Sequence, residues 1–310
     1  MGDPILVVGE ALIDVVRRTD GSVEEHAGGS PANVALGLAR LGHDVLFATS
    51  IGDDPRGRVI SDLMRDNQVT LTADSVTSTP TSVAEATLDH TGAASYHFEL
   101  SWVLPARLPT DGVTHVHTGS ISATLQPGAT TVRETFQRAR ESATLSYDPN
   151  ARPSLMGSPA DVRGQIEGLI GLADVVKASD EDVAWLYDGA TVPEVMRLWS
   201  RLGPRVVVVT RGGAGAVAVV GSEAIALNAP PTRVADTVGA GDSFMSGLLS
   251  GLLDAGLLGG PGARNRLAAA GLAEVRPALD RALACGAITV SRPGADPPTR
   301  AELEEVTAHG

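Results

Sequence analysis

The chain has 310 residues, of which 43% are apolar and 20% charged, and its formal net charge is −13. This composition is typical of a globular protein with a sizeable core, and the acidic excess argues against nucleic acid or an anionic membrane as a partner. Cys285 is the sole cysteine, which excludes an internal disulfide and a cysteine-rich metal site. No uncharged apolar run is long enough to cross a bilayer, so we expect a soluble, cytoplasmic protein.

The amino-terminal third predicts one buried strand and two hairpins. A short apolar run at 4–9 is too short for a helix and is typical of a central strand. The two hairpins have turns at Asp20-Gly21 and at 89–92. Their strands fall at 11–18 with 23–27, and at 82–88 with 94–99. We expect these strands to form a small sheet outside the main body, from segments of about 11–27 and 81–100.

The remaining elements alternate between strand and helix. Gly28-Gly29-Ser30-Pro31 leads into a helical run that ends at Gly42, with Ser30 as a candidate cap. The later strands are expected at 113–118, 143–147, 173–177, 205–210 and 216–220, and the later helices at 127–140, 159–172, 180–187, 242–254 and 276–290. Such alternation indicates a parallel sheet. We therefore predict one doubly wound α/β domain over 1–310, mostly parallel, with helices on both faces and the small β-sheet inserted.

The segment from Asp236 to Asp242, DTVGAGD, passes directly from tiny residues into an apolar helix. Tiny residues let a ligand approach the main chain, and amides at the positive end of a helix bind anions such as phosphate. Asp242 would repel that anion unless it serves another partner, such as a hydroxyl about to be phosphorylated, which it would orient as a base. The alternative is a plain turn in which Asp242 interacts favourably with the helix dipole.

This segment and the run GGSPANVA at 28–35 resemble the two motifs of the PfkB, or ribokinase-like, family of carbohydrate kinases. The resemblance covers nearly the whole chain, and it implies a ribokinase-like fold in which the small sheet is a lid. It also implies an anion hole for the transferring phosphoryl group at Gly239, Ala240 and Gly241, with Asp242 as the base that receives the sugar hydroxyl proton.

The resemblance further implies a sugar site at Asp14, Gly29 and Asn33. Asparagine is a poor residue in the first turn of a helix unless its amide binds something, which agrees with that role. The run DPNAR at 148–152 resembles the fructokinase branch, in which Arg152 would position substrate or phosphate. The alternative there is a proline-bracketed turn with an asparagine bonded to its own backbone.

The sugar expected from the resemblance is a ketohexose. Ribokinases usually carry asparagine where this chain has Leu12, so fructose giving fructose 6-phosphate is the first expectation. Ribose, 2-keto-3-deoxygluconate and nucleosides are the alternatives, as is a catalytically silent sugar-binding protein on the same fold.

The stretch KASDED at 177–182 follows a predicted strand and opens a helix, where Ser179 and Asp182 fit a capping box. The family commonly carries Asn-x-x-Glu here for magnesium and phosphate. The resemblance therefore places Ser179 at ATP and Asp182 at Mg²⁺, through a water molecule. Lys177, the only lysine, either reaches the nucleotide phosphates or lies on the surface by chance.

A second glycine-rich run, RGGAGA at 211–216, fits a dinucleotide fingerprint. That fingerprint must open a helix, whereas 216–220 is expected to be a strand, so we reject a Rossmann site. The resemblance instead makes Thr210, Gly212 and Gly215 part of the ATP pocket. Asp236 and the carbonyl of Val238 resemble positions that bind K⁺ in the family.

Two further features have structural interpretations. His115 and His117 face the same side of a predicted strand, but two histidines without a third ligand do not make a zinc site, so we expect core or edge packing. The densest aromatic cluster comprises Tyr96, His97, Phe98 and Trp102. It is expected to line the sugar lid or a dimer contact, and a homodimer through the lid is the expected assembly.

Overall fold

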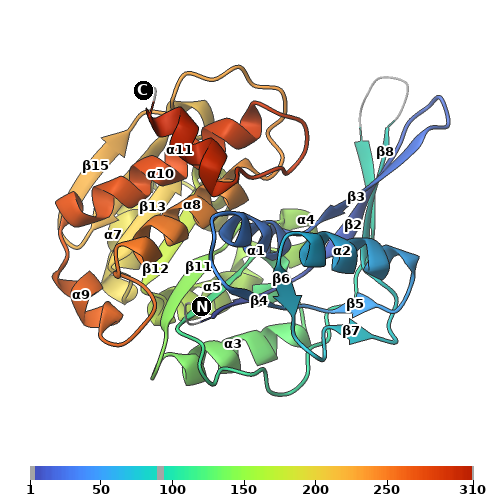
Figure 1. Ribbon diagram of the computed structural model, residues 1–310, viewed down its shortest axis with the longest axis horizontal. Coiled ribbons are helices and arrows are strands. Elements are labelled where there is room, and N and C mark those ends of the chain that lie inside the picture. Colours follow the sequence, from blue (N-terminus) through green and yellow to red (C-terminus); the bar gives the residue numbers. More distant parts are fainter. Residues whose placement is uncertain (1–3, 89–93, 309–310) are drawn as a thin grey trace.

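The computed structural model describes residues 4–88 and 94–308. A nine-stranded sheet forms the centre, in the order β15-β14-β13-β12-β11-β10-β1-β4-β6 (Figure 1). Its strands are β1 (Ile5–Val8), β4 (Val45–Ala48), β6 (Val69–Leu71), β10 (His115–Gly119), β11 (Thr144–Asp148), β12 (Val175–Ser179), β13 (Val206–Thr210), β14 (Ala216–Val220) and β15 (Glu223–Leu227). All neighbours from β6 to β13 pair in parallel, and β14 and β15 add an antiparallel edge. The predicted mostly parallel sheet is confirmed.

The strand order reverses between β1 and β10, because the chain runs outward from β1 through β4 to β6 and then returns to β10. In open α/β sheets, ligands bind beyond the carboxyl ends of the strands at such a reversal. The topology therefore directs attention to the residues that follow β1, β10, β11 and β12.

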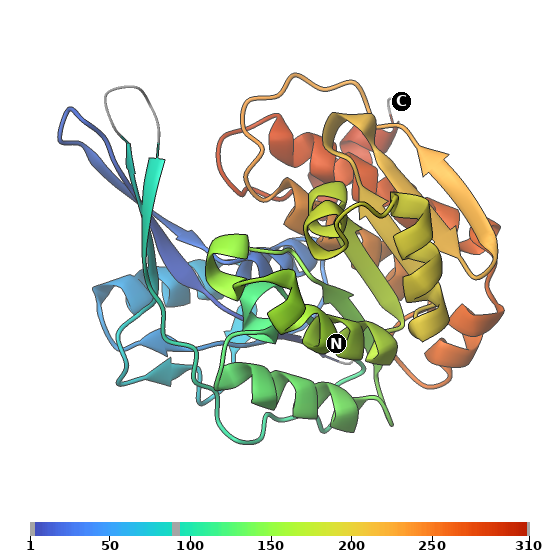
Figure 2. The same ribbon diagram turned by 180° about the vertical axis from the view of Figure 1, so that it is seen from behind.

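Helices cover both faces of this sheet, as Figures 1 and 2 show from opposite sides. One face carries α1 (Ser30–Arg40), α2 (Pro55–Asp66), α8 (Ala240–Asp254), α9 (Ala263–Ala269) and α10 (Leu272–Val290). The other carries α3 (Gly128–Ala139), α5 (Pro159–Leu172), α6 (Asp180–Leu186) and α7 (Val192–Leu202). Short helices α4 (Pro153–Met156) and α11 (Arg300–Ala308) and the 3₁₀ turns η1 (Ser120–Ala123) and η2 (Gly212–Ala214) complete the chain.

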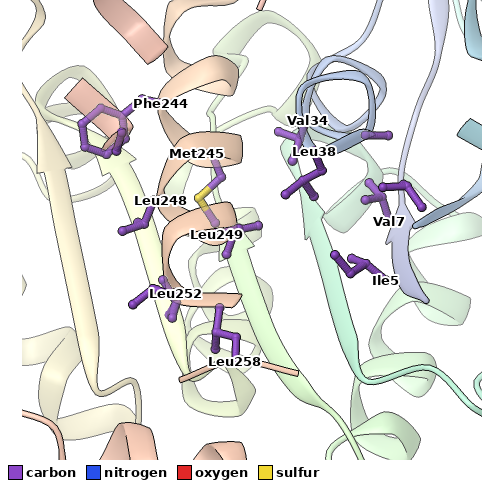
Figure 3. Close-up of a cluster of buried hydrophobic side chains, with 14 of the residues drawn as sticks. Ile5, Val7, Val34, Leu38, Phe244, Met245, Leu248, Leu249, Leu252 and Leu258 are labelled. Carbon is purple, nitrogen blue, oxygen red and sulfur yellow. The ribbon is translucent and has the colours of Figure 1, made fainter. Parts of the chain in front are cut away.

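The two cores follow from the alternation of side chains along each strand. In β1, Ile5 and Val7 pack in the core under α1 and α8, whereas Leu6 and Val8 pack in the core under α3 and α5. Parallel strands buried on both faces are expected to be continuously apolar, which explains the valine-rich run of β13. Figure 3 shows the first core, where Met245 of α8 lies beside the apolar side chains of α1.

A separate four-stranded sheet projects from the main body, in the order β3-β2-β8-β9 (Figures 1 and 2). Its strands are β2 (Leu12–Arg17), β3 (Val23–Gly28), β8 (Val83–Leu88) and β9 (Ala94–Glu99). The β2–β8 pair is parallel, and the other two pairs are antiparallel. The predicted turn at 89–92 lies outside the described residues. A further two-stranded sheet joins β5 (Ile51–Gly52) to β7 (Val76–Thr77).

The structure corrects two predictions. Ser30 is not the cap of α1: Gly29 occupies that position, and Ser30 is the first helical residue. Trp102 does not belong to the small sheet, because it is only 3% exposed in the core under α3 and its indole N–H donates to the Ser122 carbonyl at 3.1 Å. His97 is exposed on β9, and the side chain of Tyr96 lies outside the described part.

No helix within residues 4–88 and 94–308 is long and apolar enough to span a membrane.

Candidate functional site

The carboxylate of Asp242 lies in the first turn of α8 and is only 7% exposed. Its Oδ1 accepts a hydrogen bond from the Ser30 hydroxyl at 2.6 Å, and its Oδ2 accepts one from the Asn33 side-chain amide at 2.8 Å. Both donors come from the first turn of α1, so the two predicted motifs meet here although more than two hundred residues separate them. Asn33 and Asp242 therefore contact each other directly.

Free main-chain amides precede that carboxylate at the start of α8. Gly239 caps α8 in a left-handed conformation, with φ of 71°. Across the part of the chain that the structure describes, the amides of Gly239, Gly241 and Asp242 donate to no internal acceptor. The amide of Ala240 differs, because it donates to the Thr237 carbonyl at 3.3 Å. Three amides at the positive end of a 15-residue helix remain available to an anion.

Lys177 lies buried beside these amides, 3% exposed, and not on the surface. Its ammonium donates to Asp148 Oδ2 at 2.9 Å, and a side chain at Gly241 would begin 2.9 Å from the Lys177 Nζ atom. Burial by itself lowers the pKa of Lys177, but the carboxylates of Asp148, Asp182 and Asp242 outweigh it, so the pKa is raised and the group is a permanent cation. Burial raises the pKa of Asp148 to about 6, against the opposing effect of Lys177.

Asp182 and Ser179 form the predicted capping box at the start of α6. The Ser179 amide donates to Asp182 Oδ2 at 2.7 Å, and the Asp182 amide donates to the Ser179 hydroxyl at 3.0 Å. Asp182 Oδ1 accepts the Ala151 amide at 2.6 Å, which ties α6 to the loop after β11. Both carboxylate oxygens of Asp182 therefore already hold backbone amides, although each has a lone pair left.

Gly29 and Asp14 lie where the small sheet joins the main body. The φ of Gly29 is 108°, and any side chain there would begin 2.5 Å from the Glu10 carbonyl oxygen, so only glycine fits. Asp14 is half-buried on β2, and burial raises its pKa while the nearby charges of Arg152 and His26 partly offset that effect. Asp14, Gly29 and Arg152 thus lie on one side of the site.

Glu10 is a buried carboxyl group that the sequence did not single out. It follows β1 and is 6% exposed, and its Oε2 accepts the Ser122 amide at 3.1 Å. Burial raises its pKa to about 7, although hydrogen bonds from Ser120 and Ser122 and the charge of Arg152 act in the opposite direction. The only sequence signal was its position after the first strand of a parallel sheet.

Arg152 caps the short helix α4 and is exposed. Its Nη1 donates to the carbonyl and side-chain oxygens of Asn150 and to the Ala151 carbonyl. The Asn150 side chain is therefore bonded to Arg152, and the guanidinium also lies within electrostatic range of Glu10 and Asp14.

Thr210 ends β13, Gly212 begins η2, and Gly215 follows η2. The Thr210 hydroxyl donates to the Ala178 carbonyl at 3.3 Å, and Gly212 is exposed with open space around it. Gly215 is required by packing, because a side chain would begin 2.0 Å from the Leu227 carbonyl oxygen. The strand β14 follows directly, which confirms the rejection of a Rossmann fingerprint.

Asp236 links two loops beside α8. Its Oδ1 accepts the Val238 amide at 3.0 Å and its Oδ2 accepts the Gly294 amide at 2.9 Å, and these bonds lower its pKa. Val238 is 55% exposed. The expected K⁺ position therefore lies at an ordered junction of two loops, on the surface.

His115 and His117 lie on the central strand β10 and are buried in the core. Of the two expected interpretations, core packing and edge packing, the structure shows core packing. His115 contacts the Thr144 and Ser146 hydroxyls at 2.8 and 2.9 Å, and His117 contacts the Ser146 hydroxyl at 2.9 Å. Burial lowers their pKa values to about 4 and about 3, so both rings are neutral. No group of three or more metal-binding side chains occurs among the residues that the structure describes.

Two surface hollows, of about 410 and 280 Å³, lie away from this site. The first is lined by residues of 72–74 and 107–111, and the second lies below the amino ends of the strands, near His43 and Gly259. The chemistry gathers instead at the carboxyl ends of β1, β11 and β12, which is where the topology predicts a ligand. A doubly wound sheet with a separate small sheet, and a carboxylate among free amides at a helix start, define a ribokinase-like α/β protein.

Comparisons with known proteins specify the family. Residues 3–302 match the family described as pfkB family carbohydrate kinase, so the chain belongs to that family. Fructokinase from Klebsiella pneumoniae is 32% identical over 306 residues, 95% of each chain. The structure of fructokinase with bound ATP from Xylella fastidiosa is similar with a TM-score of 0.87 and 26% identity, over 100% of this chain and 99% of that chain. The structure of a double mutant of fructokinase from Vibrio cholerae O395, in a form with fructose, ADP and potassium ion bound, is similar with a TM-score of 0.79 and 25% identity. That similarity covers 98% of this chain and 97% of that chain.

Proposed function

We propose that this carbohydrate kinase transfers the γ-phosphoryl group of ATP to a hydroxyl of fructose, giving fructose 6-phosphate. The observation that carries the proposal is the position of the Asp242 carboxylate, beside three free amides and the Lys177 ammonium. Such a site places an acceptor for a hydroxyl proton next to hydrogen-bond donors and a positive charge that can bind phosphate. The similarity to proteins named fructokinase supports the choice of sugar.

The reaction follows from these groups. Asp242 accepts the proton of the sugar hydroxyl as its oxygen bonds to the γ-phosphorus, and the bond from that phosphorus to the bridging oxygen of ADP breaks. The amides of Gly239, Gly241 and Asp242 and the Lys177 ammonium stabilise the charge on the transferring group. A carboxylate at a helix start is a weak base, but phosphoryl transfer has a loose transition state, so its orientation matters more than its basicity.

Magnesium fits this site as an ion held mainly by phosphate and water. Mg²⁺ usually keeps several waters and takes one or two carboxylates, so the lack of a three-ligand cluster among the described residues agrees with it. Asp148 Oδ1 is buried without a hydrogen-bond partner, and Asp182 lies near it. We assign both carboxylates to water molecules of the ion, which would neutralise charge on the ATP phosphates.

The remaining assignments divide the site between its two substrates. For the sugar, we propose Asp14, Gly29, Asn33 and Arg152, which lie towards the small sheet. For ATP, the proposed residues are Lys177, Ser179, Thr210, Gly212 and Gly215, and the potassium ligands are Asp236 and the carbonyl of Val238.

A neutral sugar suits the acceptor side better than a sugar acid. Glu10 and Asp14 contribute two carboxyl groups there, against one guanidinium from Arg152. A substrate carboxylate or phosphate would have to approach both acids, whereas sugar hydroxyls can donate to them. This balance favours fructose over 2-keto-3-deoxygluconate.

We also propose that the small sheet is a lid within a single kinase domain over 1–310, and that it forms the contact of a homodimer. Its edge strands are β3 and β9, and Val23 on β3 is 46% exposed. Edge strands carry unpaired backbone groups that favour pairing with another chain.

The test is a coupled ADP-release assay over fructose, glucose, ribose, 2-keto-3-deoxygluconate and adenosine, with Mg²⁺ and K⁺ present. We expect the highest kcat/KM with fructose. A higher value with another acceptor would replace fructose but keep the kinase, whereas no ADP release with any acceptor would favour a silent sugar-binding protein.

A further inference from the structure

Both oxygens of the Asp242 carboxylate accept hydrogen bonds from side chains of α1. Ser30 and Asn33 are three residues apart and therefore lie on the same face of the first helical turn. The Ser30 hydroxyl donates to one oxygen at 2.6 Å and the Asn33 amide donates to the other at 2.8 Å. Ser30 and Asp242 are each 7% exposed, so water is a poor competitor for the first bond.

The spacing between α1 and α8 is set by packing below this point. Gly37 of α1 faces Ser246 of α8 so closely that a side chain at Gly37 would begin 2.3 Å from the Ser246 hydroxyl oxygen. Val34 and Leu38 lie beside Met245 on the same interface (Figure 3). The two helix starts therefore stand at a fixed distance, and Ser30 reaches Asp242 without a flexible side chain.

We infer that Ser30 is a positioning residue, which together with Asn33 holds the Asp242 carboxylate in the orientation that meets the acceptor hydroxyl. A carboxylate held at one oxygen can still rotate about its Cβ–Cγ bond, whereas donors on both oxygens remove that freedom. Hydrogen bonds to a charged acceptor are shorter and stronger than neutral ones. Each oxygen keeps a further lone pair, so the sugar hydroxyl still has an acceptor. This inference rests on the proposed kinase activity.

Ser30 and Asn33 have different roles in this arrangement. Ser30 has one hydroxyl proton, which it donates to Asp242. Asn33 has a second amide hydrogen and a carbonyl oxygen left for a sugar. Removing the Ser30 hydroxyl is therefore expected to change the chemical step alone, and removing the Asn33 amide is expected to change both sugar binding and chemistry.

The first test compares the kinetics of Ser30→Ala with those of the wild type. Misplacement of a reacting group costs up to about 100-fold in rate, so we expect kcat to fall roughly 10- to 100-fold with the sugar KM nearly unchanged. A purely structural role of Ser30 would not shift the balance between kcat and KM.

Two variants control this test. Ser30→Thr keeps the hydroxyl and is expected to restore most of kcat. Ser246→Ala removes a buried hydroxyl from the same helix interface, but that hydroxyl donates only to the Ser243 carbonyl of its own helix, so wild-type kinetics are expected. Wild-type kcat in Ser30→Ala, or an equal loss in Ser246→Ala, would overturn the inference while leaving the kinase intact.

A second measurement separates this inference from the proposed function. The carboxyl carbon of Asp242 is observed by NMR in protein labelled with ¹³C-aspartate, and its signal is assigned by its loss in Asp242→Asn. Its chemical shift is expected to differ between Ser30→Ala and the wild type, because the carboxylate loses a hydrogen bond, and to match the wild type in Ser246→Ala. This readout needs no turnover, so it decides the inference even if no sugar is phosphorylated, and an unchanged chemical shift in Ser30→Ala would refute it.

Discussion

At the scale of the residue, the site is a small set of charges whose partners come from distant parts of the chain. Asp242 receives two hydrogen bonds from α1, and Lys177 pairs with Asp148 close to Gly241. Removing Lys177 alone would leave a buried carboxylate without its partner, so its contributions to charge stabilisation and to folding are inseparable in a single variant. Asp242 is different, because an isosteric change is available there.

Asp242→Asn is expected to abolish turnover while preserving sugar affinity. The amide keeps the shape of the side chain but cannot accept the hydroxyl proton, and loss of such a base costs about 10² to 10⁴ in rate. Turnover is measured by ADP release and sugar affinity by titration calorimetry. Activity within a few-fold of the wild type would remove the base assignment, and a parallel loss of affinity would indicate a binding role instead.

At the scale of the element, α8 is the helix on which the site depends. Its first turn carries Asp242, and its body packs against both α1 and α10. Gly251 lets the backbone of α10 approach closely, because a side chain there would begin 2.5 Å from the Ala278 Cα atom. Gly251 is therefore a packing residue, although glycine is a weak helix former.

Gly251→Ala is expected to destabilise the protein by about 1 to 3 kcal/mol, because the added methyl group meets main-chain atoms that cannot move aside. Gly168→Ala is the matched control, since Gly168 lies inside α5 with open space around it. That control is expected to stabilise by about 0.5 to 1 kcal/mol through helix propensity. Both are measured by urea unfolding. Stabilisation by both substitutions would show that the α8–α10 contact does not require glycine.

At the scale of the whole molecule, two buried ionisable groups, His117 and Glu10, make stability depend on pH in opposite directions. Burial lowers the pKa of His117 to about 3, so below 6.5 the unfolded chain binds a proton that the folded ring does not, and stability falls as pH falls. Burial raises the pKa of Glu10 to about 7, so between 4.5 and 7 the folded state keeps a proton that the unfolded chain releases, and stability falls as pH rises.

Two variants separate these contributions. When the pH falls from about 7.5 to about 5, the free energy of unfolding of His117→Asn is expected to decrease by about 2 kcal/mol less than that of the wild type. The reason is that one unit of pH is worth about 1.4 kcal/mol per proton. When the pH rises from about 5 to about 7, the free energy of unfolding of Glu10→Gln is expected to increase relative to that of the wild type by about 2 to 3 kcal/mol. Urea unfolding at several pH values measures both, with His97→Asn, at an exposed ring, as the control. Identical pH dependence in all four proteins would contradict the burial argument.

The sequence by itself determined much of this protein, because its strongest signals are local. Apolar runs and the alternation of strand and helix specified the parallel sheet, and the tiny residues before Asp242 specified an anion-binding helix start. The helix at 159–172 was predicted with its observed bounds. The elements between 45 and 77 and the helix at 300–308 were not predicted, because the strands there are short and the helices carry mixed polar patterns.

Only the tertiary structure decided how the site residues pair. Ser30 had the pattern of a helix cap, yet its hydroxyl bonds Asp242, 212 positions away. Lys177 had no local feature that distinguished a surface lysine from a buried one, and its pairing with Asp148 depends on the register of β11 and β12. Side-chain type and spacing indicate what a residue can bind, but burial and partner depend on which strands and helices lie side by side, and that is a property of the packed chain.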